Sequence, residues 1–202
     1  MNYVLVAVLW TAYCSLHSFL ISIRFTNLMI RILKNYYAFY RISYVLISFI
    51  LLVPLLRFSA QVDDAVIVTY VFPFSIARDV LTVGSLLLFF WAFFFNYDSL
   101  SFFGIRQILN IGKKKKTSPS EEVKRSGLLG IVRHPMYFAL IIYLWCQTFR
   151  VTDIVGNIVL TVYIIIGTQL EEKKLVLEFG ETYVKYQQEV PMLIPFTKTF
   201  HP

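Results

Sequence analysis

Charged residues, cysteine, histidine and glycine are all scarce in this chain. Only 15% of its 202 residues are charged, and it contains 2 cysteines, 3 histidines and 8 glycines. Because Cys14 and Cys146 lie in separate apolar runs, they form neither a disulfide framework nor a metal-binding motif, and we expect buried thiols. The sequence also lacks a phosphate-binding loop, a dinucleotide-binding glycine pattern, a His/Cys metal cluster and an internal repeat. It therefore predicts no metal site.

Apolar and aromatic residues are in excess. They make up 57% of the chain, with 19 phenylalanines and 13 tyrosines, and the mean hydropathy is +0.65. This is more apolar surface than one small core can bury, so the remainder must face lipid. A secreted soluble domain, a disordered tail and a simple nucleic-acid binder are excluded, despite the net charge of +7. We expect an all-α integral membrane protein whose main partner is the lipid bilayer, with no nucleic acid.

Several apolar runs approach the length needed to cross a hydrocarbon core of about 30 Å. We expect about five transmembrane helices, at residues 3–23, 36–56, 80–97, 135–149 and 154–170. The last two are joined so closely that they must form an antiparallel hairpin. Residues 65–77 are apolar but short and contain Pro73, so an interfacial or re-entrant segment is expected there.

The basic residues divide unequally between the two sides of this arrangement. Sixteen of the 19 lysines and arginines fall on the side of the C-terminus, and only Arg57, Arg78 and Arg150 fall on the other. The positive-inside rule then predicts that the N-terminus is outside and the C-terminus cytoplasmic. The run from Lys113 to Lys116, followed by polar residues, is typical of a flexible loop against anionic headgroups rather than of a nucleotide or RNA site.

A polar motif, Arg133-His134-Pro135-Met136-Tyr137, opens the fourth expected span. Proline suits the first helical position and favours an extended residue before it, so we expect His134 at the start of the helix. With the N–H groups of the first turn, Arg133 and His134 form a donor-rich, positive spot suited to a carboxylate or phosphate. Tyr137 lies one turn later on nearly the same face. The structural alternative is that Arg133 snorkels to headgroups, His134 caps the helix and Tyr137 belongs to the aromatic belt.

Glu171 and Glu172 end the return span. Because the two spans are of similar length, we expect the acidic pair at the level of His134. Carboxylates at that depth are costly without a function or a partner. Arg133 or Lys174 is the purely structural partner that remains as the alternative.

A cytoplasmic amphipathic helix is expected near the C-terminus. Apolar and charged residues alternate after the acidic pair, with a break at Gly180, and the pattern ends at Glu189 before Val190 and Pro191. This helix is either a lid over the polar cluster or a plain membrane-surface helix.

These residues together resemble the isoprenylcysteine carboxyl methyltransferase family of integral-membrane methyltransferases. The resemblance is carried by the motif at 133–137, then, after 33 intervening residues, by Glu171-Glu172, Leu175, Phe179-Gly180, Tyr183, Tyr186, Val190-Pro191 and Pro195-Phe196. The earlier part is similar to the branch that contains NnrU-type proteins and methanethiol S-methyltransferases. That likeness rests on Leu16-His17-Ser18, Tyr40-Arg41 with Tyr44, and Asp98 with Phe103-Gly104-Ile105-Arg106-Gln107.

The resemblance implies S-adenosylmethionine as cofactor on the cytoplasmic side. The cofactor-binding residues expected from it are Arg133, His134, Pro135, Tyr137, Glu171, Glu172, Tyr183 and Tyr186, with Glu172 and Arg133 also expected to be catalytic. The cationic groups suit the cofactor's carboxylate, the glutamates its amino group or ribose, and the tyrosines its sulfonium or adenine. Residues 1–98 would then form acceptor-side membrane walls, and residues 99–202 the cytoplasmic loop, helical hairpin and lid of the cofactor site.

The acceptor is expected to be a small or lipidic molecule carrying a thiol, amine or carboxylate. In the prenylcysteine enzymes a basic residue is expected just before the Val-Pro pair, whereas this chain has Glu189, which would repel a carboxylate. His17, Arg41 and Asp98 are the other candidate acceptor residues, because they are ionisable groups within or beside the membrane. For His17, a hydrogen bond to a neighbouring helix is the equal alternative.

Two other classes stay open at this point. The membrane NADPH-dependent sterol-type reductases share a similar Arg-His-Pro-x-Tyr stretch, but they favour Asn before the Tyr, where this chain has Met136. A non-catalytic membrane protein would leave the polar cluster without a ligand. The oligomeric state is not predicted.

Overall fold

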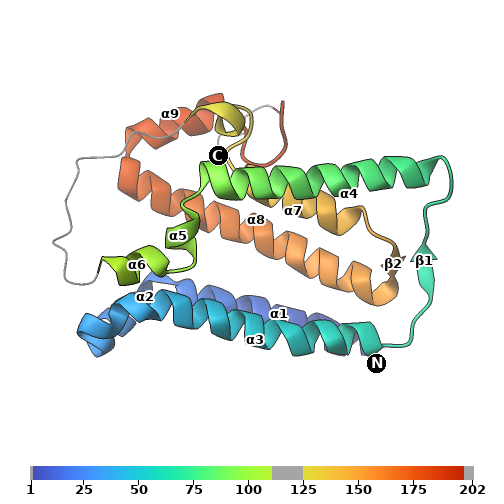
Figure 1. Ribbon diagram of the computed structural model, residues 1–202, viewed down its shortest axis with the longest axis horizontal. Coiled ribbons are helices and arrows are strands. Elements are labelled where there is room, and N and C mark those ends of the chain that lie inside the picture. Colours follow the sequence, from blue (N-terminus) through green and yellow to red (C-terminus); the bar gives the residue numbers. More distant parts are fainter. Residues whose placement is uncertain (1, 111–124, 198–202) are drawn as a thin grey trace. The chain divides into compact units, whose positions relative to one another are not determined.

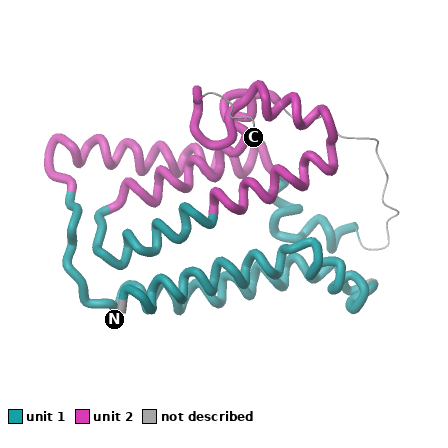
Figure 2. The backbone as a smooth tube through the Cα atoms, turned by 180° about the vertical axis from the view of Figure 1, so that it is seen from behind, with its two compact units in different colours: residues 1–69, 98–114, 148–163 teal, residues 70–97, 115–147, 164–202 magenta. Residues whose placement is uncertain are grey.

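The computed structural model describes residues 2–110 and 125–197. They form two compact units, which are described separately (Figure 2): unit 1 comprises Met1–Thr69, Asp98–Lys114 and Thr148–Tyr163, and unit 2 comprises Tyr70–Tyr97, Lys115–Gln147 and Ile164–Pro202. Within the described ranges almost all regular structure is helical. The expected all-α class is therefore confirmed. The Lys113–Lys116 run lies outside the described residues.

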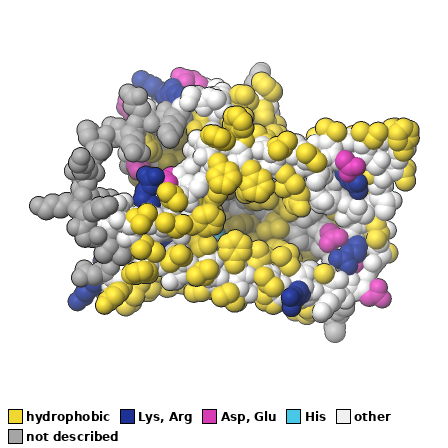
Figure 3. All heavy atoms as spheres, in the orientation of Figure 1, with side chains coloured by type: hydrophobic (Ala, Val, Ile, Leu, Met, Phe, Trp, Pro, Cys, Tyr) yellow, Lys and Arg dark blue, Asp and Glu magenta, His cyan; other side chains and the backbone are white. Residues whose placement is uncertain are grey.

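Four helices in the described ranges are long and apolar enough to cross a membrane. They are Tyr3–Ile21, Tyr36–Gln61, Phe74–Asn96 and Val151–Phe179. Many of their large apolar side chains are exposed, and Figure 3 shows hydrophobic side chains over much of the visible face, with few charged ones. Such a surface is stable only against lipid, so the protein is a multi-pass membrane protein.

The fourth expected span is shorter than the apolar run at 135–149 indicated. It corresponds to α7, Pro135–Trp145, whose 11 residues rise only about 16 Å. The chain leaves the helix at Cys146 and forms β2, Phe149–Arg150, before α8, Val151–Phe179, begins. Apolar composition alone cannot mark this end, because the residues after the helix are still apolar.

Unit 1 is built on α1, Asn2–Ile21, and α3, Tyr40–Gln61, which run side by side (Figure 1). Their buried core contains Val6, Trp10, Leu55 and Val62, and the first part of α8 packs against it through Val155, Val159 and Leu160. Trp10 Nε1 donates to Ser59 Oγ at 3.2 Å, which satisfies the indole N–H inside the apolar core.

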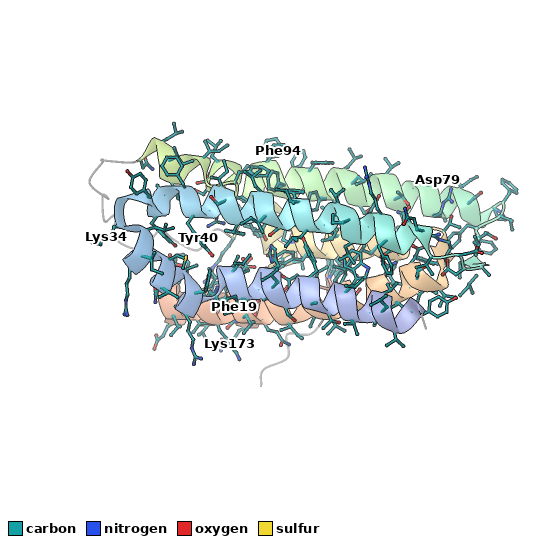
Figure 4. The ribbon with its side chains drawn as sticks, turned by 90° about the horizontal axis from the view of Figure 1, so that it is seen from below. Phe19, Lys34, Tyr40, Asp79, Phe94 and Lys173 are labelled. Carbon is teal, nitrogen blue, oxygen red and sulfur yellow. The ribbon has the colours of Figure 1, made fainter. Side chains whose placement is uncertain are left out.

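A surface helix not expected from the sequence connects these two helices. It is α2, Ile23–Leu33, followed by the 3₁₀ turn η1, Lys34–Phe39. Ser22 caps α2 through a hydrogen bond from the Phe25 N–H. Figure 4 shows Phe19, Lys34 and Tyr40 at this end of unit 1, where the Tyr40 hydroxyl donates to the Leu20 carbonyl at 2.6 Å. The two short helices α5, Ser99–Phe102, and α6, Ile105–Leu109, complete the unit's helices.

Asp64 fixes the start of α8. The strand β1, Val66–Val68, lies in the region expected to be interfacial or re-entrant. It pairs antiparallel with β2. Just before it, the fully buried Asp64 side chain accepts hydrogen bonds from the Thr152 N–H at 2.7 Å and the Thr152 hydroxyl at 2.6 Å. Arg150 lies 3.7 Å away. An acidic cap at a helix N-terminus is favoured by the helix dipole.

Acid is expected to destabilise unit 1 through Asp64. The Thr152 hydroxyl, its N–H and nearby Arg150 lower the pKa of Asp64. A carboxyl whose pKa is lowered in the folded state contributes stability above its unfolded value of about 4 and loses it as the pH falls through the folded pKa. Asp64→Asn should therefore show a smaller drop in melting temperature than the parent protein between about pH 5 and pH 3. Asp63→Asn, at the exposed neighbouring residue, is the control and should follow the parent curve.

Unit 2 contains α4, Phe74–Trp91, its one-turn π-helical continuation η2, Ala92–Asn96, the turn η3, Gly127–Gly130, α7, the second half of α8, and α9, Glu181–Glu189. α4 packs along α7, and Ala92, Phe93 and Met136 form a buried core between them. Gly180 has φ +58 and lies between α8 and α9. The expected break at this glycine and the short helix to Glu189 are both present.

Candidate functional site

The polar cluster of unit 2 is built on the start of α7. Pro135 occupies the first helical position and His134 lies at the start of the helix, as expected. His134 is not helical, with φ −123 and ψ 66, but its ψ falls short of the extended conformation expected before a proline. The main-chain N–H groups of Arg133 and His134 donate to the carbonyls of Pro191 and Met192 at 2.9 and 3.1 Å. The segment after α9 is thereby tied to the start of α7.

Arg133 and Glu172 form a buried ion pair at the centre of the cluster. Arg133 Nε and Nη2 donate to the two Glu172 carboxylate oxygens at 2.5 and 2.9 Å, and both side chains are less than 10% exposed. Arg133 Nη1 donates to the carbonyls of Gln187 and Val190. Gln187 Nε2 also donates to Glu172 Oε2 at 2.9 Å. The pair is bidentate and well satisfied, so it joins α7, α8 and α9 within unit 2.

His134 is the member of the cluster with a polar atom left over. Its Nε2 lies 3.1 Å from Glu172 Oε1, and its ring stacks on the Tyr137 ring with centroids 5.6 Å apart and planes at 17°. The residue is only 2% exposed. Its Nδ1 is buried and has no hydrogen-bond partner among the described residues. A buried imidazole nitrogen without a partner is costly, and a ligand group would satisfy it.

Glu171 faces a different set of groups from Glu172. The Tyr137 hydroxyl donates to Glu171 Oε2 at 2.9 Å. Burial, and then the nearby Glu171 carboxylate, raise the pKa of Tyr97, which follows the π-helical turn at the end of α4. Unlike Glu172, Glu171 has no cationic partner within 4 Å among the described residues. The expected return of the acidic pair to the level of His134 is thus present, with the two carboxylates in distinct surroundings.

Tyr183 and Tyr186 belong to α9 and are buried, each 3% exposed. The Tyr186 hydroxyl donates to the Leu129 carbonyl at 2.6 Å. Burial raises the pKa of Tyr186 to about 12 and raises the pKa of Tyr183 as well. Both phenols therefore stay neutral, and their contacts in this structure are those of packing residues. They join Val190 in a cluster against the end of α8.

Glu189 lies on the outer side of α9 and pairs with Arg125 at 2.7 Å. Arg125 also donates to the Thr182 carbonyl and lies 5.6 Å from the centroid of the Tyr186 ring. The negative charge of Glu189, just before the Val-Pro pair, is therefore neutralised by Arg125 from another part of unit 2.

The other three candidate acceptor residues lie in unit 1. His17 Nδ1 is 2.7 Å from the Tyr163 hydroxyl oxygen. Arg41 Nε donates to the Phe102 carbonyl at 3.1 Å. Asp98 caps α5 through Ser101 and pairs with Arg106 at 2.9 Å, and these hydrogen bonds, first that of Ser101, lower the pKa of Asp98.

Three residues near the cluster were missed by the sequence reasoning: Tyr97, Arg125 and Gln187. Tyr97 was assigned only as the last residue of a span, and Arg125 only as one of the basic loop residues. Gln187 lies four residues after Tyr183 on α9, and helical spacing from that tyrosine is the one signal that places it on the same face.

Comparisons with known proteins point to methyltransferases. No protein-family model and no solved structure matches the chain. A protein of Pseudomonas deceptionensis named methanethiol S-methyltransferase is 44% identical over 95 residues, 46% of this chain and 36% of that protein. Proteins of the same name from Crocosphaera subtropica and, numbered 1, from Bradyrhizobium diazoefficiens are 37% identical over 103 residues and 34% identical over 117 residues.

The chain is similar to these enzymes over about half of its length. The matched part spans only 36 to 40% of the length of these relatives. The similarity confirms the resemblance to the branch of membrane methyltransferases that was recognised from the motifs.

Proposed function

We propose that this protein is a membrane methyltransferase that uses S-adenosylmethionine and transfers the methyl group to a thiol. The observation that carries the proposal is the identity of 44% over 95 residues with a protein named methanethiol S-methyltransferase. The cofactor supplies an electrophilic methyl group on a sulfonium: a carbon–sulfur bond to the acceptor forms, the sulfonium carbon–sulfur bond breaks, and the thiol proton is released to solvent.

His134, Tyr137 and Glu171 are the residues we propose to contact the cofactor directly. His134 Nε2 donates to the Glu172 carboxylate, which can only accept, so the unpartnered Nδ1 of a neutral imidazole is an acceptor and suits the cofactor's ammonium group or a ribose hydroxyl. The positive start of α7 suits the cofactor's carboxylate. Glu171 has a carboxylate hydrogen-bonded by Tyr137, which suits an ammonium group or ribose hydroxyls. The aromatic pair of His134 and Tyr137 suits a sulfonium or adenine. The donor and acceptor set therefore fits the group.

Arg133 and Glu172 hold these residues in place. Four of the five N–H groups of Arg133 already bond to Glu172 and to two carbonyls. The direct cofactor-binding and catalytic roles expected of Arg133 and Glu172 stay predictions, as do the roles expected of Tyr183 and Tyr186. The contacts of Arg133 and Glu172 favour a positioning role. A pair fixed in this way holds the geometry of the site before the ligands bind. Correct positioning of the reacting groups supplies most of the rate of a methyl transfer.

The thiol loses its proton before or as its sulfur attacks, and the proton passes to solvent. Transfer from a sulfonium to a thiolate neutralises charge as it proceeds, so a dry, preorganised site favours it. Within unit 2, α4 and Tyr97 lie with the cofactor cluster. We therefore propose that the part of residues 99–202 that lies in unit 2, together with α4 and Tyr97, supplies the cofactor site, and that the remainder of residues 1–98 supplies acceptor-side walls.

The asymmetry of basic residues supports an orientation with the N-terminus outside and the C-terminus cytoplasmic. In that orientation the acidic pair and α9 face the cytoplasm, where S-adenosylmethionine is available.

Calorimetric binding of S-adenosylhomocysteine to detergent-purified protein tests the proposal. We expect saturable binding that falls about tenfold or more in His134→Ala and in Glu171→Gln, because a charge-assisted hydrogen bond contributes about 1.5–3 kcal/mol. Ile131→Ala, an exposed position three residues before His134, is the control and should bind normally.

NADPH is titrated in the same way. Binding of NADPH without binding of the nucleoside would replace the methyltransferase with a reductase. If the folded protein binds neither S-adenosylhomocysteine nor NADPH, the result would favour a non-catalytic role.

A further inference from the structure

Unit 1 contains a cavity of about 310 Å³ that the proposed cofactor chemistry does not use. It is lined from three membrane helices: Trp10, Tyr13 and His17 of α1, Leu52 and Leu56 of α3, and Leu160 and Tyr163 of α8. Its volume lies at the low end of the range of about 300–1,000 Å³ for small-molecule sites. It suits a small molecule rather than a long lipid chain.

The lining excludes a charged occupant. It contains neither lysine, arginine, aspartate nor glutamate. Burying an ion among leucines and aromatic rings without a counter-charge is strongly unfavourable. A carboxylate, such as that of a prenylated cysteine, is therefore a poor ligand for this cavity, and a neutral molecule is a good one.

One polar pair in the cavity can form a hydrogen bond with a ligand. His17 Nδ1 and the Tyr163 hydroxyl oxygen are 2.7 Å apart, in helices far apart in the sequence. The other ring nitrogen of His17, Nε2, has no hydrogen-bond partner within the described part of the chain. Whichever tautomer is present, Nε2 can still donate or accept one hydrogen bond. The Trp10 N–H, by contrast, is already bonded to Ser59.

The aromatic side chains around this pair favour a ligand that contains sulfur. The His17 ring lies 6.4 Å from Tyr13 and 6.1 Å from Tyr163, and Tyr13 lies 6.2 Å from Trp10, centroid to centroid. Thiols and thioethers contact aromatic rings favourably, and an S–H group is a weak donor that a single imidazole nitrogen satisfies.

We propose that this cavity binds a small, neutral alkyl thiol, with the sulfur at the His17–Tyr163 pair and the alkyl group against Leu52, Leu56 and Leu160. The inference rests on the proposed methyltransferase function and makes the thiol the acceptor. It restricts the acceptors to thiols that are small and uncharged. It also assigns His17 a ligand contact in addition to its bond to a neighbouring helix.

Trp10 provides a direct reading of occupancy. In a Trp91→Phe/Trp145→Phe background it is the only tryptophan left in the chain, because the sequence has 3. Titration with 1-propanethiol should change Trp10 fluorescence saturably, and propanoate at neutral pH should not. Leu52→Phe fills the cavity and should weaken thiol binding about tenfold or more. His17→Phe keeps a ring, removes the hydrogen bond and should weaken binding severalfold.

Leu46→Phe is the matched control, because Leu46 lies on the same helix and is 55% exposed. It should leave thiol binding unchanged, which separates cavity occupancy from partition into detergent. Equal titrations in the Leu52→Phe and Leu46→Phe proteins would overturn the proposal, as would saturable binding of propanoate.

S-adenosylhomocysteine binding is measured on the same preparations. A parent protein that binds the nucleoside but shows no Leu52-dependent thiol binding removes only this inference. A parent protein that binds no nucleoside removes the proposed function, whatever the thiol result.

Discussion

Replacing Glu172 with alanine should lower the free energy of unfolding by about 3–5 kcal/mol, the cost of leaving one partner of a buried ion pair unpaired. Arg133 would keep its guanidinium in a site where it is 7% exposed, with no carboxylate to receive Nε and Nη2. His134 Nε2 and Gln187 Nε2 would lose the same acceptor. The contacts that join α7, α8 and α9 would fail together.

Thermal unfolding in detergent measures this effect. For a chain of about 200 residues, a loss of this size lowers the melting temperature by about 10 °C. Glu178→Ala is the matched control, because it removes a glutamate from the same helix at an exposed position. Equal melting temperatures of the two variants would contradict the structural role given to the Arg133–Glu172 pair.

Gly104→Ala should destabilise unit 1 by about 2–5 kcal/mol, from two causes that add. Gly104 has φ +83, a conformation that costs an alanine about 1–2 kcal/mol. Its Cβ would also lie 2.8 Å from the Ile42 nitrogen and 3.0 Å from the Arg41 Cβ, an overpacking that costs about 1–3 kcal/mol. Backbone atoms cannot move aside as a flexible side chain would.

Gly84→Ala tests the opposite case. Gly84 lies within α4, and a Cβ there would have nothing within 4 Å. Its replacement should stabilise the helix by about 0.5–1 kcal/mol. The two melting temperatures should therefore shift in opposite directions. A Gly104→Ala protein as stable as its parent would show that the turn between α5 and α6 can relax away from α3.

The arrangement of the polar cluster followed from spacing, whereas its hydrogen bonds did not. A helix start at Pro135 and an acidic pair after a return span of similar length predict that the pair lies at the level of His134. The contact is present, but the two helices are not of equal length, because α7 ends at Trp145 and α8 begins at Val151. Which glutamate pairs with Arg133 depends on the rotation of α8 about its axis. That rotation is decided by packing, and sequence periodicity in an apolar helix does not report it.

The membrane helices were predictable to a similar extent. Long apolar runs located α1, α3, α4 and α8, but the run at 135–149 hid the end of α7 because the chain stays apolar beyond Trp145. Helix α2 was missed for the reverse reason: polar residues interrupt its apolar ones, so it resembled a loop. His17 was noticed as an intramembrane histidine, but its contact with Tyr163 joins residues 146 apart in the sequence. Only tertiary structure reveals such a contact.

The shortness of α7 has a consequence for the surrounding lipid. A helix that rises about 16 Å covers roughly half of a hydrocarbon core of about 30 Å. Where α7 faces lipid, we expect the bilayer to thin locally, and this hydrophobic mismatch costs a fraction of a kcal/mol for each ångström. Membranes with short acyl chains reduce the cost and thick, sterol-rich ones increase it. We therefore expect the protein to be more stable in bilayers of short acyl chains than in thick ones.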